Sequence, residues 1–219
     1  MSGTLSVLSK ALIVAALFSA KAYAQTPAKS NNPPSRPRLN VAAQFEANMN
    51  NMVRSHSAFS SSQKISDFSA LCSHKEMSVA CMDSYLDGKL KGPISPVEST
   101  LLMAEAVTAA LSLSLNPALP KKATQCQKIY LLGSWSYRIL SAHIEADVGL
   151  PDYKTLTTEE ERAEWKEVLK SNQAALPEAT TGARSKVKGI LTQSLQSFPE
   201  NDGEIAACSR DLRKLVSRF

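Results

Sequence analysis

Histidine, glycine and aromatic residues are scarce in this chain, and their scarcity argues against several kinds of chemistry. The 219 residues include 3 histidines (His56, His74 and His143) and 8 glycines, and aromatic side chains make up 6%. The P-loop, GxGxxG, HExxH and GxSxG motifs are all missing, so neither a phosphate-binding loop, nor a zincin, nor a nucleophile elbow is indicated. His143 and Asp147 are four residues apart, but one imidazole and one carboxylate do not complete a metal site. We therefore predict no metal and no cofactor.

A strong excess of charge is also lacking, as is the residue alternation of β-strands. Lys and Arg number 25 against 20 Asp and Glu, which gives a formal net charge of +5. This mild excess is not the basic signature of a nucleic-acid-binding domain, so we predict no nucleic-acid partner. No stretch shows the period-two pattern of a strand, and no internal repeat is present. Helical spacing recurs throughout, so the sequence predicts an all-α fold.

The N-terminus has the three regions of a secretory signal peptide. Lys10 supplies the positive charge, Ala11–Ala20 is an apolar run of about ten residues, and Ala22-Tyr23-Ala24 places small residues at the −3 and −1 positions. Such a run is too short to span a bilayer. We predict cleavage of residues 1–24 before Gln25, and location in the periplasm or secretion. The mature chain would keep 195 residues and, without two lysines, a net charge of +3.

The predicted mature chain begins with a leader and continues as one domain. Residues 25–40 contain four prolines and no apolar periodicity, which is typical of a disordered segment. Residues 41–219 are long enough to bury a sizeable core, and we predict that they form a single helical domain.

Four cysteines follow the signal peptide: Cys72, Cys81, Cys126 and Cys208. Because an exported chain with an even number of cysteines normally forms disulfides, we expect two bridges. Three pairings are conceivable, and we favour Cys72–Cys81 with Cys126–Cys208. The spacing lacks the close pairs of a zinc site.

The stretch Ser95–Asn116 is the predicted centre of the fold. Ser95 is suited to the N-cap, Pro96 to the first helical position, and Glu98 to the third position of a capping box. The residues that follow are apolar over most of the helix circumference, which is typical of a helix buried by several neighbours. The length also matches a membrane span, but two glutamates favour a core helix in the mature chain, with no transmembrane segment.

The remaining apolar periodicities predict an irregular bundle of about six or seven helices. Gly133, between Tyr130 and Tyr137, would allow close helix approach. The other predicted helices are a short turn at 65–71, Val41–Ser57, Ser73–Asp87 with a Ser73/Glu76 capping box, Lys121–Val148, Glu159–Lys170, Pro177–Phe198, and a last helix capped by Asn201 and Glu204.

Two short resemblances bear on function. Val97-Glu98-Ser99 at a helix start resembles the Glu-Ser of lysozyme-like lytic transglycosylases, which implies Glu98 as the general acid and base of peptidoglycan cleavage. The family's Gly-Leu-Met-Gln stretch is missing here. The spacing Cys72-x8-Cys81, with Tyr85 and Gly88 after it, resembles small periplasmic helical immunity proteins, which act by binding.

The sequence thus favours an exported periplasmic binding or accessory protein over an enzyme. Its partner would be another envelope protein or peptidoglycan, in secretion, envelope assembly, or inhibition of the immunity type. The solvated helix Glu159–Lys170 and the basic leader are the candidate contact surfaces. The alternative is a peptidoglycan lytic enzyme that uses Glu98.

Overall fold

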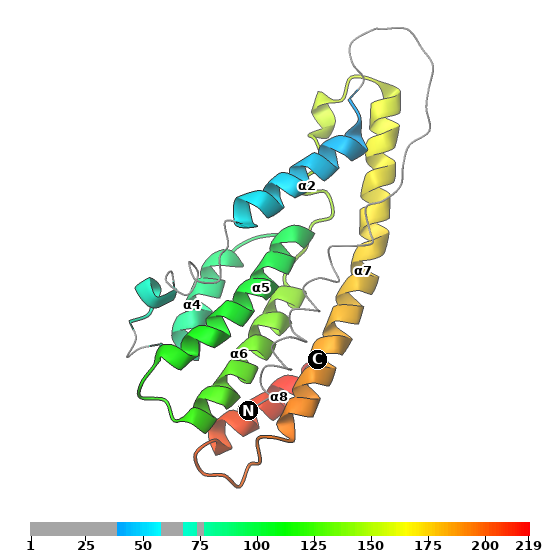
Figure 1. Ribbon diagram of the computed structural model, residues 1–219. Helices are drawn as coiled ribbons and strands as arrows, with labels where there is room; N and C mark the ends of the chain where they lie inside the picture. Colours follow the sequence, from blue (N-terminus) through cyan, green and yellow to red (C-terminus); the bar gives the residue numbers. More distant parts are fainter. Residues whose placement is uncertain (1–38, 58–67, 74–76) are drawn as a thin grey trace.

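The structure is a computed structural model that describes residues 39–57, 68–73 and 77–219, although not the side chains of 52–57 (Figure 1). The predicted signal peptide and most of the predicted leader lie outside the described residues. Within them, the helices are α2 (Val41–Ser57), a short turn at residues 68–71, α4 (Val79–Lys89), α5 (Pro96–Ser112), α6 (Lys121–Ser141), α7 (Glu159–Leu195) and α8 (Ala206–Val216), with 3-10 turns η1 (Leu113–Leu115) and η2 (Tyr153–Thr155).

The predicted all-α bundle of six or seven helices is confirmed. The described residues contain no strand, and one isolated parallel bridge pairs Ile94 with Ile144. Helices α5 and α6 lie side by side in the centre, and α4 packs against α6 (Figure 1). The long helix α7 runs down one side. It contacts α2 in its upper part and packs against α6 and α8 in the lower part.

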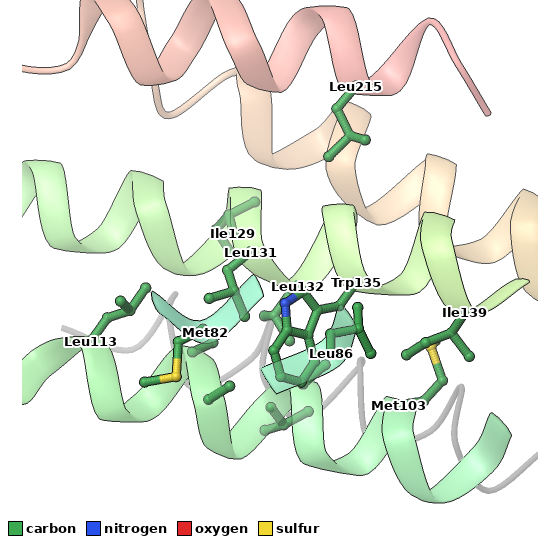
Figure 2. Packing of buried hydrophobic residues seen from close by; sticks show 14 of the residues in the cluster. Met82, Leu86, Met103, Leu113, Ile129, Leu131, Leu132, Trp135, Ile139 and Leu215 are labelled. Atoms are coloured by element: carbon green, nitrogen blue, oxygen red, sulfur yellow. The ribbon is translucent and has the colours of Figure 1, made fainter. Parts of the chain in front are cut away.

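The core lies between α4, α5 and α6 and continues to α7 and α8. Trp135 is fully buried in the C-terminal half of α6 with Leu86 of α4 close by, and Met103 of α5 lies beside Ile139 of α6 (Figure 2). Leu131 and Ile139, one turn to either side, are also fully buried. This continuous apolar contact is what the apolar sides of the helices predict.

Helix α5 begins as the sequence predicts. The Ser95 hydroxyl accepts a hydrogen bond from the Glu98 amide at 3.0 Å, and Glu98 Oε2 accepts one from the Ser95 amide at 2.8 Å. Within the part of the chain that the structure describes, Pro96–Leu115 is the one helical stretch long and apolar enough to cross a membrane. Some 61% of its most apolar window is buried inside the protein, as expected for a core helix.

Both predicted disulfides are present. Cys72 is bonded to Cys81, nine residues along the chain, and Cys126 is bonded to Cys208, 82 residues along. The second bridge joins α6 to α8. Two cystines place the chain in an oxidising, extracytoplasmic compartment.

Helix α6 is shorter than predicted, because it ends at Ser141 rather than Val148. Ala142 is extended, and the next residues pair with the segment before α5. The Ile94 amide donates to the His143 carbonyl at 2.9 Å, and the Glu145 amide donates to the Ile94 carbonyl at 3.0 Å. The local sequence would suit a helix, but these long-range bonds hold the backbone extended.

Helix α7 is one continuous helix where the sequence predicted two, Glu159–Lys170 and Pro177–Phe198. Its 37 residues include Pro177, which has no amide to donate to the carbonyl of Gln173. Gln173 and Pro177 are both exposed, so water can hydrate that carbonyl. The break expected at the proline is therefore avoided.

Two helix starts also differ from the predictions. Helix α4 begins at Val79, where the Ser78 hydroxyl accepts from the Cys81 amide at 3.3 Å, so Ser73 is not its cap. Helix α8 begins at Ala206, because the Asp202 carboxylate accepts from the Glu204 amide at 3.1 Å and holds residues 202–204 in a turn. In both places a polar side chain further along the sequence makes the local hydrogen bond.

Candidate interaction surface

The N-terminal part of α7, predicted as a contact surface, is exposed on one side and tied to the protein on the other. Its solvent side carries Glu159, Glu160 and Glu167. The basic residues on that side are Arg162, Lys166 and Lys170. Thr158 and Glu161 form a capping box at the helix start, as the sequence indicates.

Glu161 does much more than cap the helix. Its Oε2 accepts from the amides of Thr157 at 2.9 Å and Thr158 at 3.1 Å, and its Oε1 accepts from the Leu39 amide at 3.0 Å. The backbone amides of Thr158, Leu39 and Thr157 lower the pKa of this carboxyl to about 2. Glu161 therefore remains ionised and joins the segment before α2 to the start of α7.

Helix α2 is attached to α7 by further bonds near Glu161. The Ala42 amide donates to Glu164 Oε1 at 3.2 Å, and the Ala43 amide donates to Asn40 Oδ1 at 2.8 Å. Asn40 thus caps the start of α2. Leu39 and Asn40 were predicted to lie in the disordered leader, but both make specific bonds here.

The loop before α7 is also fixed to it. Trp165 Nε1 donates to the Pro151 carbonyl at 2.9 Å, and the ring packs edge-on against Tyr153 at 5.1 Å. The Arg162 guanidinium donates to the Leu156 carbonyl through two nitrogens, at 3.3 and 3.1 Å. Further along α7, the Asn172 amide nitrogen donates to the Ala146 carbonyl at 3.1 Å. These hydrogen bonds fix the orientation of α7, so its exposed side has a defined position on the protein.

The surroundings of this surface are acidic. Residues 145–178, which we call the acidic end, contain nine acidic and four basic side chains. Of these acids, Glu161 is buried and the others are exposed or half-buried. Such an excess attracts a cationic partner over a distance of about 10 Å at moderate salt.

Glu98, the candidate catalytic residue, faces its own helix start. Besides the Ser95 amide, its Oε2 accepts from the Ser95 hydroxyl at 2.9 Å. Ser95 is fully buried. The carboxylate is thus used in the capping box, and this geometry does not favour its predicted role in peptidoglycan cleavage.

The histidines and carboxylates do not assemble a metal site in the part of the chain that is described. His143 is exposed, and its Nε2 lies 3.7 Å from Glu145 Oε1. The predicted helix Lys121–Val148 included both His143 and Asp147, but α6 ends at Ser141, before either residue. The described residues hold no group of three potential metal ligands. His74 and the His56 side chain lie outside the description.

A partly buried polar cluster around Trp135 was not predicted. Trp135 Nε1 donates to Asp83 Oδ1 at 2.9 Å, and its ring stacks on Tyr85, whose hydroxyl donates to Glu105 Oε2 at 2.7 Å. Burial raises the pKa of Asp83, while the Trp135 bond and Arg138 oppose that rise. Asp83 and Asp87, four apart on α4, both pair with Arg138. The cluster orients α4 on α6. In the sequence, the spacing of Asp83 and Asp87 by four residues is the one signal that could have indicated it.

Comparisons of the chain with protein-family models, with curated proteins and with solved structures find no match. A functional proposal therefore depends on the residues of this chain alone.

Proposed function

We propose that this chain is an exported periplasmic accessory protein that binds another macromolecule of a Gram-negative envelope through the acidic end. The exposed side of α7 between Glu159 and Lys170 is the proposed contact surface. The observation that carries the proposal is that this surface has a fixed orientation. On the opposite side of α7, Glu161, Glu164 and Trp165 make hydrogen bonds to the backbone of neighbouring segments.

Preorganisation is what makes such a surface suitable for binding. A partner does not have to order a surface that is already held by backbone hydrogen bonds, so less conformational entropy is lost on association. Glu160 and Glu167 are seven residues apart on one side of the helix, with Lys166 and Lys170 beside them. This mixed pattern suits a partner with complementary charges. The acidic excess of the surrounding residues 145–178 favours a basic envelope protein.

Binding also fits the rest of the chain better than catalysis does. The two disulfides agree with export to the periplasm. Glu161, whose pKa the surrounding backbone amides lower to about 2, is buried in a structural network rather than exposed to a substrate. An accessory or inhibitory role in the envelope requires only a stable surface of this kind.

The test is affinity capture from envelope extract with the tagged, oxidised mature protein and two matched variants. The first variant carries Glu159→Gln, Glu160→Gln and Glu167→Gln on the proposed surface. The second carries Glu200→Gln, Glu204→Gln and Asp211→Asn at the other end of the protein, so it loses the same three charges. We expect a partner that the wild type and the second variant retain and the first variant loses.

Equal capture by all three proteins would overturn the choice of surface. Equal loss in both variants would mean that net charge alone drives the association. Thermal unfolding of each variant shows whether it is folded, so that loss of the partner can be distinguished from loss of the fold.

A further inference from the structure

The charge of the described chain is separated along its length. The acidic end, residues 145–178, has five more acidic than basic side chains. Residues 184–219 have the opposite balance, with seven basic and four acidic side chains. The N-terminal half of α6, which carries Lys121, Lys122 and Lys128, lies beside α8 at the same end of the protein (Figure 1). We call residues 184–219 together with these three lysines the basic end. Helix α7 connects the two ends over a length of about 55 Å at 1.5 Å per residue.

Helix α8 carries the most regular part of this positive charge. Arg210, Lys214 and Arg218 follow one another at intervals of four residues, so they line one side of the helix and of the turn after it. All three are exposed, and the Lys214 side chain is 72% accessible. The opposite side of α8 is buried through Leu212 and Leu215.

The stripe of Arg210, Lys214 and Arg218 is only partly neutralised by neighbouring acids. Lys214 lies 3.6 Å from Asp211, an exposed pair that salt screens readily. Arg210 and Arg218 make no ion pair with any described residue. Elsewhere in the basic end, Lys186 and Lys188 of α7 are also exposed.

Helix α8 is firmly attached, so the stripe has a fixed orientation. The Cys126–Cys208 disulfide ties the first turn of α8 to α6. The Ser209 hydroxyl donates to the Phe198 carbonyl at 2.6 Å within the core. At the other end, Phe219 packs edge-on against Tyr137 at 5.3 Å.

We propose that the basic end binds the surface of an anionic phospholipid membrane, with the α8 stripe as its main contact. The exposed side of a helix is convex, and its cations are spaced by about one helical turn of 5.4 Å. Such an array suits an extended sheet of negative headgroups better than one small anion. The exposed side of α8 carries no aromatic side chain, so it lacks the stacking groups typical of single-stranded nucleic-acid binding.

The charge separation also determines how the protein would stand on the membrane. The basic end is attracted to the negative surface, whereas the acidic end is repelled by it. The surface between Glu159 and Lys170 would therefore point away from the lipid and remain open to a protein partner.

The test is flotation of the oxidised mature protein with vesicles at low and at high salt. We expect binding to vesicles of phosphatidylglycerol and phosphatidylethanolamine at 50 mM salt, release at 500 mM salt, and no binding to phosphatidylcholine alone. Each basic residue near such a surface contributes about fivefold in partitioning. The partition coefficient of the variant Arg210→Gln/Lys214→Gln/Arg218→Gln onto these vesicles at 50 mM salt should therefore be about 100-fold lower than that of the wild type.

The matched control is Lys154→Gln/Lys166→Gln/Lys170→Gln, which removes three positive charges from the acidic end. We expect it to bind nearly as well as the wild type, and both variants should keep the wild-type melting temperature. Equal weakening by both variants, equal binding to neutral vesicles, or binding to soluble heparin without binding to vesicles would each overturn the proposal. None of these outcomes bears on capture of a protein by the acidic end, so the two proposals fail separately.

Discussion

Ser99 and Ser209 are both fully buried, yet their hydroxyl groups have opposite surroundings. The Ser209 hydroxyl donates to the Phe198 carbonyl, whereas the Ser99 hydroxyl has no hydrogen-bond partner among the described residues. A buried polar group without a partner destabilises the fold, and a buried hydrogen bond stabilises it.

The substitution Ser99→Ala should therefore raise the free energy of unfolding by about 1 kcal/mol, and Ser209→Ala should lower it by about 1–2 kcal/mol. Urea unfolding of the two variants under the same conditions measures both effects. A loss of stability in Ser99→Ala would mean that its hydroxyl has a partner in the folded protein.

Glu161 leads to a prediction about pH. Its pKa is about 2 in the folded protein and near 4.5 without its hydrogen bonds. A lowered carboxyl pKa stabilises the folded state fully above pH 4.5, and this contribution disappears as the pH falls towards 2. Glu161→Gln should therefore be less stable than the wild type at pH 7, and the difference should shrink at pH 3. Urea midpoints at pH 7, 5 and 3 measure it, with Glu167→Gln as the exposed control; a difference independent of pH would contradict the assignment.

Single-residue roles were predictable where the partner is near in sequence. Ser95 with Glu98 and Thr158 with Glu161 are three residues apart, so helix geometry alone predicts their bonds. The bond from Trp135 to Asp83 joins residues 52 apart, and the bond from Leu39 to Glu161 joins residues 122 apart. No local pattern contains that information.

Among the helices, Gly133 and Gly182 differ in what surrounds them. A Cβ atom on Gly133 would lie 2.8 Å from side-chain carbons of Leu191 and Leu215, where α6, α7 and α8 meet. A Cβ atom on Gly182 would meet nothing within 4 Å. The close approach predicted at Gly133 is confirmed, and Gly182 has no such role.

Replacement of each glycine by alanine should therefore have opposite effects. Gly182→Ala should stabilise α7 by about 1 kcal/mol because alanine has the higher helix propensity. Gly133→Ala gains the same propensity, but crowding in the core costs about 1–3 kcal/mol, so we expect a net loss of stability. Thermal and urea unfolding of the two variants measure the signs, and a stabilised Gly133→Ala would show that the leucines can move aside.

Helix boundaries were predictable where a capping side chain or a breaker acts alone. Val41–Ser57 has the predicted ends. The end of α6 and the continuity of α7 through Pro177 were not predictable, because long-range pairing of Ile94 decides the first and solvent exposure of the proline turn allows the second.

At the scale of the whole molecule, the composition was informative about architecture and much less so about function. Apolar periodicity and the even number of cysteines predicted a disulfide-bonded helical bundle. Both signals can be read from the sequence without knowledge of which helices pack together. The charge separation was not predicted, although the sequence holds an acidic segment at 145–178 and a basic one at 184–219. The overall net charge of +5 hides the two segments, and only the arrangement of the helices shows that they lie at opposite ends of the protein (Figure 1).

The two disulfides should stabilise this architecture unequally. In the chain-entropy model, a bridge restricts the unfolded chain more as the loop that it closes becomes longer. The separations of 9 residues for Cys72–Cys81 and 82 for Cys126–Cys208 correspond to about 2.7 and 4.5 kcal/mol. The variant Cys126→Ala/Cys208→Ala should thus lose roughly 2 kcal/mol more than Cys72→Ala/Cys81→Ala. Urea unfolding of both, each with its other bridge intact, measures the difference. Equal losses would mean that the long bridge acts mainly on the folded state, as an attachment of α8 to α6, because an effect on the unfolded chain must grow with loop length.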